Sequence, residues 1–210
     1  MSQRIAILGW GSLITRPRNL KSSSFDFNGP IFPIQFSRIS RYGSVTLVKD
    51  LINGLDVVTW SAISDFNNLG QAINNLKERE ETIEDYIGFI DLIEMKYSSV
   101  YTHDHNIFIY KGYFNHDIFD QELPTSLEQF LRDIINWSIE NNVESTIWTD
   151  LPTNFSNNTN FEFNYDNLMY YLSSLPSETK YRNIDYILNI PSNVYHTLNT
   201  DLLLSSLSLV

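Results

Sequence analysis

An apolar run ends in a glycine-rich turn at residues 4–14, which read Arg4-Ile5-Ala6-Ile7-Leu8-Gly9-Trp10-Gly11-Ser12-Leu13-Ile14. The short apolar run Arg4 to Leu8 predicts a buried strand. Gly9 and Gly11 then let the backbone turn tightly and leave main-chain amides pointing outward. We therefore expect a turn of exposed amides plus the Ser12 hydroxyl, suited to holding a carboxylate or a developing oxyanion. A tight turn that binds no ligand is the alternative.

This turn matches none of three common glycine-rich motifs. Ile14 stands where a dinucleotide-binding fingerprint needs its third glycine, and Arg16-Pro17 follows where that motif needs a helix. No Gly-Lys-Ser/Thr ends the turn, as a phosphate-binding P-loop requires. Ser12 is not in the Gly-x-Ser-x-Gly setting of a hydrolase nucleophile. The turn is therefore interpreted together with residues elsewhere in the chain.

The composition is that of an acidic, cysteine-free globular protein. The 210 residues are 42% hydrophobic and 19% charged, and their formal net charge is −11. We expect one domain over residues 1–210 with a C-terminal extension. Nucleic acid is not expected as a partner, because phosphate binding needs a basic surface. Zero cysteines exclude disulfides, thiolate catalysis and cysteine-bound zinc, and they fit a cytoplasmic location. No apolar run is long enough to cross a membrane.

Strand and helix patterns are mixed along the chain. Extended segments are expected at 30–40, 44–48, 106–114 and 146–148. Asn53-Gly54 predicts a β-hairpin that joins 47–48 to 55–60. Helix starts are expected at Asn67 or Asn68, at the capping box 125–128, and at Asp166 or Asn167. The Asn/Ser/Thr-rich stretch 152–160 is expected to be a loop, and the apolar tail 202–210 to pack against the domain or a second subunit.

Glu80 is the most informative carboxylate of the chain. The helix expected after Asn68 has apolar positions at i, i+3, i+4 and i+7 from Leu69, and Glu80 projects within about 60° of that stripe. Arg79 is expected on its flank. A carboxylate on a core-facing stripe must be paired, kept protonated or placed in a pocket. The alternatives are that the helix ends before Glu80 or that Glu80 only pairs with an arginine.

The turn and this glutamate together resemble the gamma-glutamylcyclotransferase family. Residues 8–14 are similar to the Gly-Tyr-Gly-Ser-Leu-Ile or Tyr-Gly-Ser-Asn motif of that family. Leu76-Lys77-Glu78-Arg79-Glu80 is similar to the Leu-x-x-Arg-Glu setting of its catalytic glutamate. The resemblance extends over roughly residues 4–95. Trp10 stands where the family usually has tyrosine, and 59–62 stand where relatives often have a glycine-containing strand.

The resemblance implies an α+β fold in which helices surround a mixed, partly closed β-barrel. It also implies a lyase or transferase that cyclises a gamma-glutamyl group of a small amine or peptide to 5-oxoproline, without a cofactor. Glu80 would be the general acid and base. The substrate would be held by Gly9, Trp10, Gly11, Ser12, Leu13 and Arg38. One alternative is a catalytically altered relative that binds a small ligand in the same pocket. A structural interaction module is another, and it predicts a salt-bridged Glu80 that no cavity reaches.

Arginines and histidines supply two further candidate clusters. Arg38 and Arg41 could hold a substrate carboxylate, or they could be solvated strand residues. His103-Asp104-His105 and His116-Asp117 contain three of the four histidines. Histidines two residues apart share a face only on a strand, and no third ligand is in register, so no metal is expected. A small molecule is the expected partner, and a homo-oligomer is left open.

Overall fold

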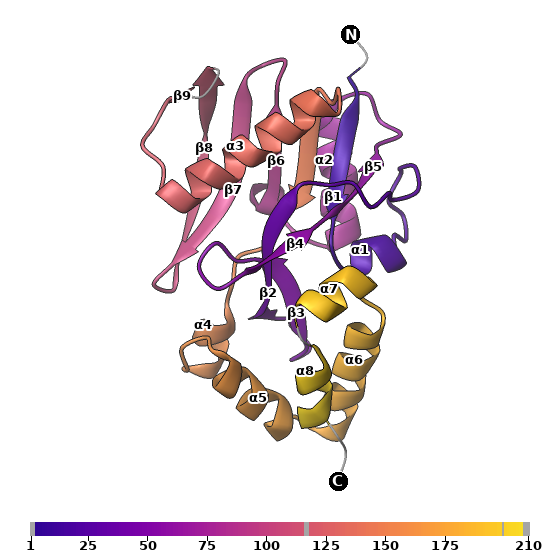
Figure 1. Cartoon of the computed structure of the whole chain (residues 1–210), viewed down its shortest axis with the longest axis vertical. Coiled ribbons are helices and arrows are strands. Elements are labelled where there is room, and N and C mark those ends of the chain that lie inside the picture. The colour runs from indigo at the N-terminus through magenta and orange to yellow at the C-terminus, as the bar shows by residue number, and fades with distance from the viewer. Residues whose placement is uncertain (1–2, 116–117, 199, 208–210) are drawn as a thin grey trace.

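The computed structural model describes residues 3–115, 118–198 and 200–207. In this part of the chain the strands form a seven-stranded sheet and a three-stranded sheet, with helices around both (Figure 1). The predicted mixed α+β class is therefore confirmed. The described strands do not close into one barrel, and the partly closed barrel stays a prediction.

The large sheet has the strand order β5-β1-β10-β6-β7-β8-β9. β1 is the second strand in this order and is buried along its whole length, as the apolar run predicts. β1 pairs parallel with β10 and antiparallel with β5. Because the two strands are parallel, the chain leaves β1 and β10 at the same end of the sheet. The strands are β1 (Ile5–Gly9), β5 (Trp60–Ile63), β6 (Ile87–Asp91), β7 (Lys96–His103), β8 (Asn106–Asn115), β9 (Ile118–Phe119) and β10 (Ser145–Thr149).

The small sheet contains β2 (Ile31–Ile39), β3 (Val45–Lys49) and β4 (Leu55–Val58). Both β3 and β4 pair with β2 and not with each other, so the predicted hairpin across Asn53-Gly54 is wrong. The chain does turn there, because the Asp50 carboxylate accepts hydrogen bonds from the Ile52 and Asn53 amides. The Asp50 amide also donates to the Pro33 carbonyl, which places the turn over β2. β2 therefore lies between the two strands.

Helices α2 (Leu69–Glu80) and α3 (Thr125–Glu140) cover opposite faces of the large sheet (Figure 1). Alternate residues of a strand point to opposite faces. Ile147 of β10 packs in one core cluster with Leu76 of α2, whereas Trp148 packs in the other with Phe130 of α3. The Asn68 side chain caps α2, as predicted. The predicted capping box does not form, because α3 begins at the first residue of that motif.

The C-terminal helices gather beside the small sheet, at the end of the molecule away from the N-terminus (Figure 1). Residues 155–159 form α4 where a loop was predicted, because Phe155 is buried against Phe163 and Tyr171. The tail packs on the domain through Leu203 and Leu207, while 208–210 are outside the described residues. These helices are α4 (Phe155–Thr159), α5 (Tyr165–Ser174), α6 (Ser177–Leu188), α7 (Ser192–Thr197) and α8 (Thr200–Ser206). None of the helices in the described ranges has the length and apolarity that crossing a membrane requires.

Candidate functional site

A cavity of about 540 Å³ opens where the turn after β1 meets the end of α2. Its walls include residues of β1, β2, β3, β10 and α6, so both sheets and the C-terminal helices contribute to it. The structure brings all seven predicted site residues to this cavity, although their roles stay a prediction. They are Gly9, Trp10, Gly11, Ser12, Leu13, Arg38 and Glu80.

The turn after β1 continues into a single turn of helix, α1 (Ser12–Thr15). We expected no helix at this position. It forms because the buried Leu13 anchors it, and the Ile14 amide donates to the Gly11 carbonyl at 3.0 Å. Gly11 is held close to α6, since a Cβ atom there would lie 3.3 Å from the Tyr186 hydroxyl. The turn is therefore packed on both sides and not an open loop.

Trp10 forms an apolar part of the cavity wall. Its ring is buried and packs against Phe32 of β2, with 5.3 Å between the ring centroids. Tryptophan supplies no phenolic hydroxyl at this position, so the cavity loses a polar group that a tyrosine would bring. The nearby Tyr186 supplies a hydroxyl from α6 instead.

Glu80 is the last residue of α2, and its side chain is 15% exposed. Burial raises the pKa of this carboxyl, and the Arg79 guanidinium opposes the shift. Its Oε1 atom lies 3.0 Å from Arg79 Nη1. Two of the expected alternatives therefore hold together: Glu80 pairs with an arginine and also lines a cavity. The raised pKa is the property that a general acid needs near neutral pH.

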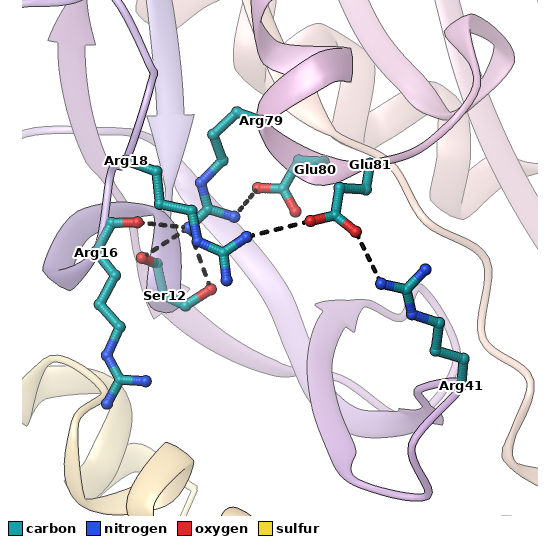
Figure 2. Close-up of polar contacts among 7 residues, drawn as sticks. All are labelled: Ser12, Arg16, Arg18, Arg41, Arg79, Glu80 and Glu81. Carbon is teal, nitrogen blue, oxygen red and sulfur yellow. Dashed lines mark hydrogen bonds and ion pairs between the residues drawn. The ribbon is translucent and has the colours of Figure 1, made fainter.

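Arg79 is expected on the flank of α2, and the structure shows that its side chain is buried. Its side chain is 5% exposed and reaches the carbonyls of α1: Nη2 donates to Ser12 O at 2.9 Å and to Arg16 O at 2.8 Å. Figure 2 shows this side chain between the two segments. A guanidinium can satisfy carbonyls at a helix end, and its length allows it to leave the helix flank. Arg79 therefore fastens α2 to the turn.

Glu81 follows α2 in a left-handed conformation with φ 51° and lines the cavity. Its carboxylate lies 2.9 Å from Arg41 Nη2 and 3.5 Å from Arg18 Nη1 (Figure 2). All three side chains are exposed, so each of these ion pairs is weak. Arg41, a candidate for holding a substrate carboxylate or for a solvated strand residue, is exposed, pairs with Glu81 and lines the cavity, but it lies in the turn after β2 and not on a strand.

Arg38 is half-buried and donates from Nη1 to the Pro152 carbonyl at 2.7 Å. Burial lowers the pKa of this guanidinium. The cavity is lined by four arginines, at positions 18, 38, 41 and 79, and by two glutamates, 80 and 81. No other lining residue is charged at neutral pH. The excess of positive charge favours a ligand that carries a carboxylate or a comparable anion.

Tyr186 and Thr149 also line the cavity, and the sequence did not single them out. The Tyr186 hydroxyl accepts a hydrogen bond from the Leu47 amide at 3.2 Å. Burial raises the pKa of Tyr186 to about 12, so it stays a neutral phenol at physiological pH. Thr149 Oγ1 is buried, and its side-chain interaction with the Glu80 carboxyl lowers the pKa of Glu80, against the larger effect of burial. Neither position belongs to a local motif, and only the tertiary fold brings them here.

The histidine cluster lies at the β7–β8 turn, away from this cavity. His103 Nδ1 is 3.2 Å from Asp104 Oδ2, while His116 and Asp117 fall outside the described residues. Across the ranges that the structure covers, no three His, Cys, Asp or Glu side chains gather in a way that could hold a metal ion.

Comparisons of this chain with protein-family models, with curated proteins and with solved structures find no match. The interpretation of the cavity therefore depends on the chemistry of its own residues.

Proposed function

We propose that this protein is a gamma-glutamylcyclotransferase-like enzyme that cyclises a gamma-glutamyl group of a small amine or peptide to 5-oxoproline. The observation that carries the proposal is the position of Glu80. It lines a cavity beside the Gly9–Ser12 turn, and burial raises its pKa. The family resemblance and the helix phase select this same residue from the sequence.

The reaction needs one proton carrier and a folded substrate. The α-amine of the substrate attacks its γ-carbonyl carbon, a C–N bond forms, and the C–N bond to the leaving amine breaks. Glu80 takes the proton from the attacking nitrogen and returns it to the leaving nitrogen. Arg79 engages Oε1, so we assign the transfer to Oε2. Tethering of amine and carbonyl in one molecule lowers the entropic barrier, and the cavity holds them in the attacking geometry.

The binding groups suit a gamma-glutamyl compound. A volume of about 540 Å³ falls in the range of small-molecule sites. The excess of arginine can hold the α-carboxylate, and the turn after β1 supplies main-chain donors for the developing oxyanion. Two sheets that share one core are compatible with the partly closed barrel of the family. The absence of cysteine supports action in the reducing cytoplasm.

The test uses wild type, Glu80→Gln and the matched control Glu78→Gln. Glu78 is on the same helix but is exposed and outside the cavity. Each protein is incubated with gamma-glutamyl dipeptides, gamma-glutamylamines and glutathione, and 5-oxoproline is followed by mass spectrometry. We expect product from wild type and Glu78→Gln, and a rate on the order of 10²- to 10⁴-fold lower for Glu80→Gln. Absence of product from wild type across the panel overturns the proposal.

A second candidate function is a binding protein that uses the same cavity without catalysis. Trp10 favours it, because the tyrosine hydroxyl that the family usually has at this position is missing. Calorimetric titration separates the two functions. Binding of gamma-glutamyl dipeptides without any 5-oxoproline supports the binding protein, whereas turnover supports the enzyme.

A further inference from the structure

A second cavity, of about 240 Å³, lies between the β7–β8 turn, α4 and the turn after β3. It shares no lining residue with the larger cavity. Asn157 Nδ2 donates to the His105 carbonyl at 3.4 Å, which joins α4 to the β7–β8 turn beside it (Figure 1). At the start of α4, the Asn154 side chain exchanges hydrogen bonds with the amide and the carbonyl of Ile39 in β2. The walls are therefore held in place by contacts between distant segments, as in a pre-formed binding site.

Ser37 of β2 lines this cavity with a hydroxyl group that has no partner. The residue is 1% exposed, and no hydrogen-bonding group lies within reach of its Oγ atom in the part of the chain that the structure describes. Buried hydroxyls normally have a hydrogen-bond partner, because leaving one unpaired is costly. A ligand in the cavity would supply that partner.

The cavity is rich in carboxylates. Asp50, Asp104 and Glu162 line it from three different segments, and no lysine or arginine is among the lining residues. The exposed Glu162 carboxylate forms no ion pair with any residue that the structure describes. Asp50 Oδ1 accepts from two amides of its turn, whereas Oδ2 accepts only from Asn53 Nδ2 at 3.3 Å and can take a further donor. This charge distribution favours a cation.

An organic cation fits the cavity better than a bare metal ion. His103 and His105 also line it, yet no three His, Cys, Asp or Glu side chains converge as metal ligands within the described ranges. The volume is several times the roughly 30 Å³ that one water molecule occupies in the liquid, so a single ion leaves most of it unfilled. Phe155 and Phe163 supply an apolar part of the wall, and their rings lie 5.4 Å apart, edge to face. Methylene and ammonium groups both pack favourably on aromatic rings.

We propose that this cavity binds a small aliphatic amine with more than one ammonium group, such as a short diamine. An ammonium group has three N–H donors and no acceptor, so it matches the Ser37 hydroxyl oxygen and the carboxylates. Two ammonium groups suit carboxylates that come from separate segments, and the methylenes between them would lie along Phe155 and Phe163. The volume is below the usual range for drug-sized ligands, which favours a small molecule.

This proposal does not depend on the chemistry of the larger cavity, whose excess of arginine repels the same ligand. Calorimetric titration of the whole chain with 1,4-diaminobutane tests it. The matched control is 1,4-butanediol, which has the same carbon chain and no charge. We expect the diamine to bind, with an affinity that falls as salt is added, and the diol not to bind. Equal affinities for the two compounds, or no binding heat from the diamine at millimolar concentration, overturn the proposal.

Two variants locate the binding. Ser37→Ala removes a hydroxyl that has no hydrogen bond to lose, so the free energy of unfolding should not fall, while Kd for the diamine should rise about tenfold. Glu162→Gln should raise Kd by about fivefold or more. Glu140→Gln, an exposed position on α3 outside the cavity, makes the same change in net charge and should leave Kd unchanged. Binding that is unaffected in either cavity variant, or weakened equally by Glu140→Gln, also overturns the proposal.

Discussion

Arg79 and Glu80 are adjacent in the sequence, yet their side chains meet 3.0 Å apart beside the cavity. Neighbours within a helix normally point about 100° apart and do not face each other. These two can meet because α2 ends at Glu80, and the left-handed Glu81 follows. One arginine thus contacts the proposed acid-base residue and, through Ser12 O and Arg16 O, the turn after β1.

Replacing Arg79 by methionine should destabilise the protein strongly. The variant leaves the Glu80 carboxylate without its partner and two carbonyls without their donor. Breaking a buried pair in this way costs about 3–5 kcal/mol. Urea denaturation measures the loss. Arg182→Met is the control, because Arg182 forms an exposed ion pair with Glu178 on α6 and should cost under about 1 kcal/mol. Equal losses in both variants would contradict the structural role of Arg79.

The pH dependence of stability should report the burial of Glu80. Its pKa in the folded state is raised above the usual value. The carboxyl is protonated in both states below the unfolded pKa of about 4.3, so its favourable contribution is complete there. That contribution falls as the pH rises, because the unfolded carboxyl releases its proton while the buried one keeps it, and it is lost once the pH has risen through the folded pKa. Wild type should therefore lose stability relative to Glu80→Gln from about pH 4.3 upward, until the folded pKa has been passed.

This prediction is checked by urea denaturation of both proteins between pH 4 and pH 8. Glu78→Gln on the exposed face of α2 controls for the change in net charge. A constant difference between wild type and Glu80→Gln over the whole range would show that Glu80 has the same pKa in both states.

The sequence predicted those features of the fold that depend on contacts within a single segment. The Asn68 cap, the buried strand β1 and the cavity position of Glu80 follow from capping and periodicity within one segment. The hairpin at Asn53-Gly54 fails because a turn signal does not reveal that β2 will lie between the two strands.

The other missed features depend on tertiary contacts. The burial of Arg79 depends on carbonyls more than 60 positions away in the sequence. Tyr186 reaches the cavity from α6, where no motif marks it. Periodicity places a side chain on a face of its own helix, but it does not identify the segment that meets that face.

Lys49 and Asp150 form a buried ion pair close to the cavity. The residues next to them in the sequence, Val48, Thr149 and Leu151, line the cavity. Lys49 Nζ is 2.7 Å from Asp150 Oδ1, and the side chains are 3% and 0% exposed. Lys49→Met should lower the free energy of unfolding by about 3–5 kcal/mol, because the buried Asp150 carboxylate keeps its hydrogen bonds from Ser99 and Val100 but loses its only cationic partner among the described residues. The double variant Lys49→Met/Asp150→Leu should recover part of this loss, since neither charge is then buried. A double variant no more stable than the single one, measured in urea, would contradict this account.

Neutralising Glu81 should strengthen the binding of an anionic substrate. Glu81→Gln removes one of two negative charges from the cavity and releases Arg18 and Arg41 from their ion pairs. The stability should change by under about 1 kcal/mol, because these pairs are exposed. If the proposed substrate is held by its carboxylate, KM should fall by about three- to tenfold at low ionic strength, and the effect should shrink in salt.

The assay compares KM for a gamma-glutamyl dipeptide between wild type, Glu81→Gln and Glu78→Gln at two salt concentrations. Glu78→Gln makes the same change in net charge outside the cavity, so its KM should stay close to that of wild type. A rise in KM for Glu81→Gln would reverse the assignment. Glu81 would then contact the substrate ammonium group directly, and the arginines would serve mainly to hold Glu81 in place.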